Sequence, residues 1–214
     1  MNFISLATYM STRGAYGYRA DRKDKVTYNH WGSYPAELGA SIFEYVAKTD
    51  LDSMRNVARH IKLVNRNSIP SPKLIARYKK YADITVSDRS YKDWYCLLRK
   101  TQGSLYAHHQ GLEHMIDSRE FLYDSLFCEW AYIIDLDTQN LEIYRGFNKS
   151  PRAEGRYAPR HVPDCRGYYG VRLVAEFPFV MIRNSDVEDL VALAQVANSA
   201  RRQKTLLAQT EKKK

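Results

Sequence analysis

The chain has 214 residues, of which 44% are hydrophobic, and it carries a formal net charge of +9. This length fits one domain or two small ones, and the apolar content is ordinary for a packed globular protein. No run of 18 apolar residues and no basic apolar leader is present, so we expect neither a helical membrane span nor a signal peptide.

Three cysteines, Cys96, Cys128 and Cys165, are widely spaced and form no CxxC pair. We therefore expect neither a structural zinc site nor a disulfide scaffold, and we expect a protein of the reducing cytoplasm.

The positive charge is concentrated in two segments. Residues 201–214 hold six basic residues and one acid, and residues 145–172 hold seven basic residues and two acids. Each segment has a net charge of +5, so the rest of the chain is close to neutral. We expect an anionic partner to be met at these segments. The C-terminal one is a chain end and reads as a solvated tail.

The first predicted elements form a hairpin. Alternating residues in 12–19 and in 26–30 predict two strands, joined by the polar residues 20–24. Pro35 suits the first turn of a helix. The apolar stripe of this helix consists of Leu38, Ile42, Tyr45 and Val46.

Several helices are predicted next, from their capping residues. Thr49 with Asp52 forms one capping box, Ser71-Pro72 opens a second helix, and Ser90 with Asp93 repeats the capping pattern. A further helix is expected over 105–116, whereas 121–127 is ambiguous between helix and strand.

Strands return in the last part of the chain. Residues 130–136 and 141–145 predict a second hairpin, 145–167 a long loop and 168–177 another strand. In that last strand, Val171, Leu173, Ala175 and Phe177 should share a face. Ser185 with Glu188 is expected to cap a final helix. Its apolar stripe consists of Val187, Leu190, Val191 and Ala194.

Adjacent hairpins with helices between them predict an α+β fold with a mainly antiparallel sheet and a C-terminal helix. We expect residues 11–200 to form a single domain. Residues 1–10 would be an N-terminal extension and 201–214 a basic tail.

The densest cluster of reactive groups lies at residues 28–35, between a strand and a helix. Here Asn29, His30, Ser33 and Tyr34 are candidate ligand-binding residues, and His30 is also a candidate acid or base. The alternative is a structural turn over packed aromatic rings.

Arginine and aromatic residues alternate between residues 144 and 169. Guanidinium groups and stacking faces suit a nucleotide or single-stranded nucleic acid, so Arg145, Arg152 and Arg156 are candidate ligand-binding residues. Arg19, in the first strand, is included in the same set. The alternative is a mobile, solvated loop. The chain has no Walker loop, no GxGxxG and no RNP motif, and we expect no cofactor.

Ser11 is a candidate nucleophile if translation starts at Met10 and that methionine is removed. Residues 14–18 loosely resemble the first strand of class II glutamine amidotransferases, although those enzymes need an N-terminal cysteine.

Metal sites are not expected. The loop that begins at Asp135 lacks the glycine and glutamate of a calcium loop. His109 and Glu113 are four residues apart without an HExxH pattern.

Two blocks of the chain resemble a family of small, uncharacterised tailed-bacteriophage proteins. The first block contains YGYR, KVTYNH and SYPAELG; the second runs from EWAYIIDLD to LEIYRGF. The resemblance covers less than a third of the chain and implies an accessory role during infection, without an established activity.

Three functional hypotheses therefore remain open at this point. The first is a phage accessory protein, for counter-defence or host takeover, that binds an anionic ligand such as a nucleotide or nucleic acid. The second is an N-terminal-nucleophile hydrolase that uses Ser11. The third is a protein-interaction or virion-associated module with a host partner and no small-molecule site. None of the three involves a membrane.

Overall fold

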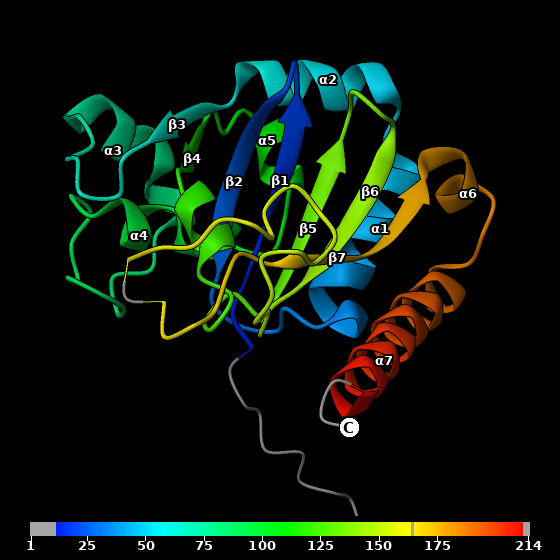
Figure 1. Ribbon diagram of the computed structural model, residues 1–214. Helices are drawn as coiled ribbons and strands as arrows, with labels where there is room; N and C mark the ends of the chain where they lie inside the picture. Colours follow the sequence, from blue (N-terminus) through cyan, green and yellow to red (C-terminus); the bar gives the residue numbers. More distant parts are fainter. Residues whose placement is uncertain (1–11, 164, 212–214) are drawn as a thin grey trace, which may run out of the picture.

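The computed structural model describes residues 12–163 and 165–211, with side chains described up to residue 199. A five-stranded sheet in the order β2-β1-β5-β6-β7 lies at the centre (Figure 1). Its strands are β1 (Gly14–Ala20), β2 (Lys23–Asn29), β5 (Trp130–Asp135), β6 (Asn140–Arg145) and β7 (Arg172–Pro178). The α+β fold expected from the sequence is confirmed.

Both predicted hairpins are present, and they join side by side through a parallel pair. β1 pairs with β2 and β5 pairs with β6 in antiparallel fashion, whereas β1 and β5 run parallel. The β1–β2 turn needs two left-handed residues, Asp21 and Arg22, with φ of 51° and 60°. Their amides donate to the carboxylate of Asp137 at 2.9 Å each, so the second hairpin holds the turn of the first.

Helices cover one face of the sheet (Figure 1). They are α1 (Ala40–Lys48), which follows a π-helical turn η1 (Pro35–Gly39), then α2 (Leu51–His60), α6 (Phe179–Arg183) and α7 (Val187–Glu211). The predicted apolar stripe that leads into and along α1 is buried, and so are Leu190 and Ala194 of α7. Each helix therefore turns one apolar side toward the sheet. These side chains pack on Tyr16, Tyr18 and Tyr132 of the sheet.

The opposite face is covered by the 3-10 turn η4 (Arg119–Tyr123) and by the long segment between β6 and β7. Its apolar centre joins Ala15, Val26, Ala131 and Ile133 of the strands to Leu122 of η4. We call this the loop face. Strand side chains alternate between the two faces, so Arg13, Tyr28 and His30 belong to one end of the loop face.

A smaller layer packs beyond β2 and has its own apolar cluster. It consists of the parallel strands β3 (Lys62–Val64) and β4 (His114–Ile116) with α3 (Pro72–Tyr78), η2 (Lys79–Tyr81), α4 (Trp94–Leu97), η3 (Arg99–Thr101) and α5 (Tyr106–His109).

Two capping predictions were wrong by a few residues. The cap of α2 is Asp50, whose Oδ1 accepts from the amide of Ser53 at 2.8 Å, because α1 extends to Lys48 and Thr49 ends it. Likewise, Asp93 itself caps α4 by accepting from the amide of Tyr95. Ser71 caps α3, as predicted.

The helix predicted over 105–116 is also wrong in extent. It ends after four residues of α5, since Gly111 takes a left-handed φ of 90°, and the chain then enters β4. In β7, a register shift opposite Ile143 and Tyr144 breaks the expected alternation. As a result, Val171 and Leu173 face the loop side while Phe177 faces the helices.

The last helix begins close to the predicted cap and includes residues 201–211 of the expected basic tail. None of the helices in the described ranges is long and apolar enough to cross a membrane.

Candidate functional site

A groove of about 410 Å³ opens at the end of the loop face where β1 begins and β2 ends. Its lining comes from the residue before β1, from β2, from the turn after β3, and from η4 with the segments on either side of it, so residues far apart in the sequence meet in the folded chain. The lining residues are Arg13, Tyr28, Arg66, Ser118, Phe121 and Phe127.

Backbone hydrogen bonds hold the two groove arginines in place. The carbonyl of Arg13 accepts from the amide of Glu129 at 3.0 Å, which ties the start of β1 to the segment before β5. Arg66 lies in the turn after β3. There Asn65 accepts from the amides of Asn67 and Ser68, at 2.8 Å through its side chain and at 3.0 Å through its carbonyl.

Aromatic rings form the walls of the groove. Tyr28 meets Phe121 edge to face, with ring centroids 5.1 Å apart. Phe127 is 45% exposed, and the guanidinium of Arg13 lies 5.8 Å from its ring centroid. An exposed ring beside a cation offers a flat ligand both a stacking surface and a positive charge.

The groove arginines carry positive charge that no described carboxylate pairs with. Among the described side chains, neither Arg13 nor Arg66 forms an ion pair. Burial raises the pKa of Tyr28, and the charges of Arg13, Arg66 and Arg99 oppose that rise. Three guanidinium groups therefore act on the hydroxyl of Tyr28.

His30 lies at the border of the same groove. Its Nδ1 is 2.7 Å from the hydroxyl of Tyr28, and its amide donates to Oε1 of Gln102, which also accepts from Arg99. Burial lowers the pKa of His30, and the charges of Arg99 and Arg13 lower it further. These effects favour the neutral form of the His30 ring.

Four other predicted site residues gather at the same end of the sheet, on its helix-covered face. The buried amide of Asn29 donates to Oγ of Ser33 at 2.9 Å, within the turn that leads to α1. Arg145 lies 4.9 Å from the ring of Trp130 and donates to the carbonyl of Glu129. Burial lowers the pKa of Arg145, and Tyr34 is among the groups that oppose this shift. Tyr34 therefore lies near enough to Arg145 to act on its charge, whereas Tyr28 and His30 face the other side of the sheet.

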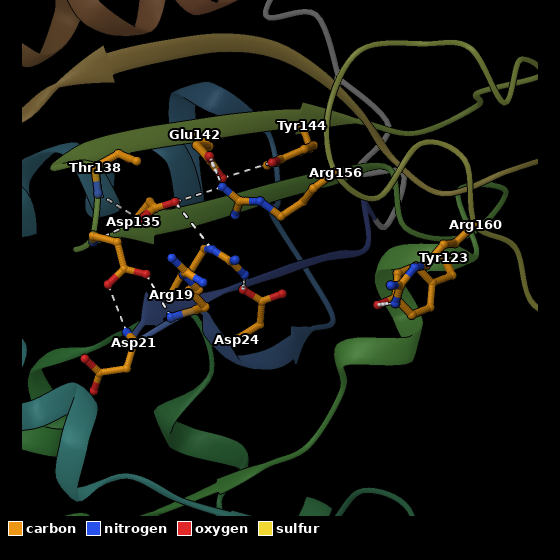
Figure 2. A network of polar contacts seen from close by, with 12 residues as sticks. Arg19, Asp21, Asp24, Tyr123, Asp135, Thr138, Glu142, Tyr144, Arg156 and Arg160 are labelled. Atoms are coloured by element: carbon orange, nitrogen blue, oxygen red, sulfur yellow. Dashed lines mark hydrogen bonds and ion pairs between the residues drawn. The ribbon is translucent and has the colours of Figure 1, made fainter.

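The other predicted arginines lie elsewhere. Arg19 and Arg156 meet at the far end of the loop face, around two buried carboxylates (Figure 2). Nη2 of Arg156 donates to Asp135 at 2.8 Å and also to Glu142, while Arg19 pairs with Asp24 at 2.9 Å.

This far cluster is electrically compensated. Its two guanidinium groups are matched by the carboxyl groups of Asp24, Asp135 and Glu142, so it adds no excess positive charge. Burial raises the pKa of Glu142 to about 7, against the opposing charge of Arg156. The hydroxyl of Tyr144 donates to the same carboxyl at 2.9 Å. Arg156 belongs to the long segment between β6 and β7, which we call the covering segment. We interpret the cluster as the contact that fixes the covering segment to the sheet, and not as a binding site for an anion.

Arg152 is exposed and lies in the covering segment between β6 and β7. Ser11 lies outside the described residues. Glu113, four residues after His109, forms ion pairs with Lys62 and Arg77. Within the described part of the chain, no group of three His, Cys, Asp or Glu side chains is placed to hold a metal ion.

Comparisons with protein-family models, with curated proteins and with solved structures found no match to this chain. The interpretation of the groove therefore rests on its own residues.

Sequence reasoning singled out the cluster at residues 28–35, which contains Tyr28 and the bordering His30, but it named none of the groove-lining residues as site residues. Arg13, Arg66 and Phe127 are far apart in the chain, and no spacing or motif connects them. The fold brings Arg13 and Arg66 to one groove beside exposed aromatic rings, and this proximity is what distinguishes them from the other arginines of the chain.

Proposed function

We propose that this protein binds a nucleotide-class ligand in the groove lined by Arg13, Arg66 and Phe127. The observation that carries the proposal is the combination of arginines without ion pairs and aromatic walls in one groove. A base would stack against Phe127, and the two guanidinium groups would contact the phosphate. A volume of about 410 Å³ is within the range of small-molecule sites.

The charges of the molecule support this groove over the far cluster of the loop face. Binding an anion at Arg156 would require it to leave the buried carboxylates of Asp135 and Glu142. At Arg13 and Arg66 no such partner is lost. The resemblance of two sequence blocks to phage proteins supports an accessory role for this binding during infection, in counter-defence or host takeover.

The central prediction compares two charge-matched double variants. Arg13→Gln with Arg66→Gln is expected to weaken AMP binding about a hundredfold, roughly tenfold for each lost guanidinium–phosphate contact. The control, Arg152→Gln with Arg166→Gln, removes two exposed arginines of the segment between β6 and β7. It should change the affinity less than about twofold. Isothermal titration calorimetry at low salt measures both.

The outcome separates the groove from the arginine-rich segment. Equal losses in the two variants would mean that general surface charge attracts the nucleotide. A larger loss of affinity in the control would show that the nucleotide binds at the segment between β6 and β7. The wild-type affinity should also fall as salt rises, since the phosphate contact is ionic.

His30 provides a second, pH-based prediction. A bound phosphate would offset the charges of Arg99 and Arg13, so binding should raise the pKa of His30 from its lowered value. By linkage, the affinity should increase as pH falls through the pKa of the complex.

The suitable ligand is the methyl phosphodiester of AMP, whose charge is constant between about pH 5 and 8. NMR titration of the His30 ring protons, with and without this ligand, measures the shift. An unchanged or lower His30 pKa in the complex would place the phosphate away from the groove.

A further inference from the structure

A second groove, of about 610 Å³, begins on the other side of Arg66. Its lining consists of Arg66, Asn67, Ser68, Ile69, Ser87, Asp88, Ser90, Lys92 and Asp93. Arg66 is thus common to both grooves, and a ligand that contacts Arg66 can extend into either one.

The two grooves differ in charge and chemistry. The first has aromatic walls and an excess of positive charge. In the second, Asp88 and Asp93 balance Arg66 and Lys92, and serine hydroxyls and an asparagine amide make up much of the rest. A neutral surface rich in hydrogen-bonding groups does not favour a second phosphate. It suits hydroxyl and amino groups, such as those of a ribose and a base edge.

Asp88 and Lys92 are exposed and, among the described side chains, form no ion pair. Asp93 is already engaged, because its carboxylate accepts from the amide of Tyr95 and from Cys96. Asp88 is therefore the carboxylate of this groove that can accept from a ligand amino group.

We propose that the second groove is a subsite for a second nucleoside, so that the ligand is two nucleosides joined by a phosphodiester. The first base stacks in the aromatic groove, Arg66 contacts the linking phosphate, and the second ribose and base occupy the neutral groove. This inference rests on the proposed function, since it uses the same Arg66.

The test compares AMP with the dinucleotide pApA on the full chain. The dinucleotide should bind about tenfold more tightly, because the second groove adds hydrogen bonds and contact area. Asp88→Ala with Lys92→Ala should remove that gain and leave AMP binding unchanged. These residues are exposed, so the fold is not at risk. Glu44→Ala with Lys48→Ala, an exposed acid and base on α1, is the charge-matched control and should change neither affinity.

The outcomes distinguish this inference from the proposal beneath it. If AMP binds and pApA binds no more tightly, the second subsite is overturned while the nucleotide site stands. If neither ligand binds, both proposals fail. A gain that persists in the Asp88 and Lys92 variant would also overturn the subsite, because the extra contacts would then lie elsewhere.

A hexanucleotide of adenylate tests how many nucleosides the two grooves bind. It should bind at most about fivefold more tightly than pApA, the statistical gain from its overlapping dinucleotide positions, since the two grooves accommodate two nucleosides. A further gain of tenfold or more would overturn the two-nucleoside footprint and indicate a longer single strand.

Discussion

Replacing Arg156 with methionine is expected to lower the free energy of unfolding by about 3 kcal/mol. The guanidinium of Arg156 is the common partner of Asp135 and Glu142, which are 1% and 5% exposed (Figure 2). Methionine keeps most of the side-chain volume but removes the charge. Two buried carboxyl groups would then lack their main partner. Removing one member of a buried ion pair is costly because the other charge stays buried without compensation.

Urea denaturation of matched variants measures this effect. Arg152→Met, in the same segment but exposed, should change the stability by less than about 0.5 kcal/mol. The double variant Arg156→Met with Glu142→Gln should recover part of the loss, since one of the two stranded carboxyl groups is gone. If Arg156→Met were as mild as Arg152→Met, the cluster would not anchor the segment.

The hairpins and most helices could be predicted because their signals are local. Alternation in β1, β2, β5 and β6 and the buried stripe of α1 are properties of short windows of sequence. Two kinds of feature could not be predicted in this way. Helix ends depend on which of several neighbouring polar residues becomes the cap, as Asp50 shows. The parallel pairing of β1 with β5 joins strands more than 100 residues apart, and no local pattern encodes it.

The candidate site shows the same limit. An arginine in a sequence gives no sign of whether it will be paired. Arg156 was a candidate for ligand binding because arginines and aromatic residues alternate around it, yet in the fold it contacts two buried carboxylates. Arg13 and Arg66 stand in unremarkable surroundings in the sequence but line the groove that keeps a positive charge. Availability of charge is a property of the tertiary structure.

The two ends of the loop face therefore differ in their charge. At one end, opposite charges cancel and tie the covering segment to the sheet. At the other, positive charges remain open to solvent beside aromatic rings. The apolar cluster of Ala15, Val26 and Ile133 lies between them. Because the ends are separate, substitutions at the Arg156 cluster should alter stability while the groove keeps its ligand contacts.

Glu142 is expected to make the protein less stable as pH rises from about 5 to 8. Its pKa is about 7 in the folded protein, against an ordinary value of 4.5. The folded state therefore keeps a proton that the unfolded state releases. This contribution to stability is complete below about pH 4.5 and is lost as pH rises through 7, with a total on the order of 2 kcal/mol between pH 5 and 8.

Histidines with a lowered pKa change the stability with pH in the opposite direction. The contribution of Glu142 is therefore measured as the difference in stability between the wild type and a variant without this carboxyl group. Burial lowers the pKa of His108 to about 4, and that of His114 is lowered as well, which makes stability rise with pH below about 6.5. Glu142→Gln leaves these histidines in place and removes only the titrating carboxyl group. The stability of the wild type minus that of Glu142→Gln should therefore fall steadily from pH 5 to 8 in urea denaturation. A flat difference would mean that Arg156 keeps Glu142 ionised throughout, and a rising one would mean that its pKa lies below the ordinary value.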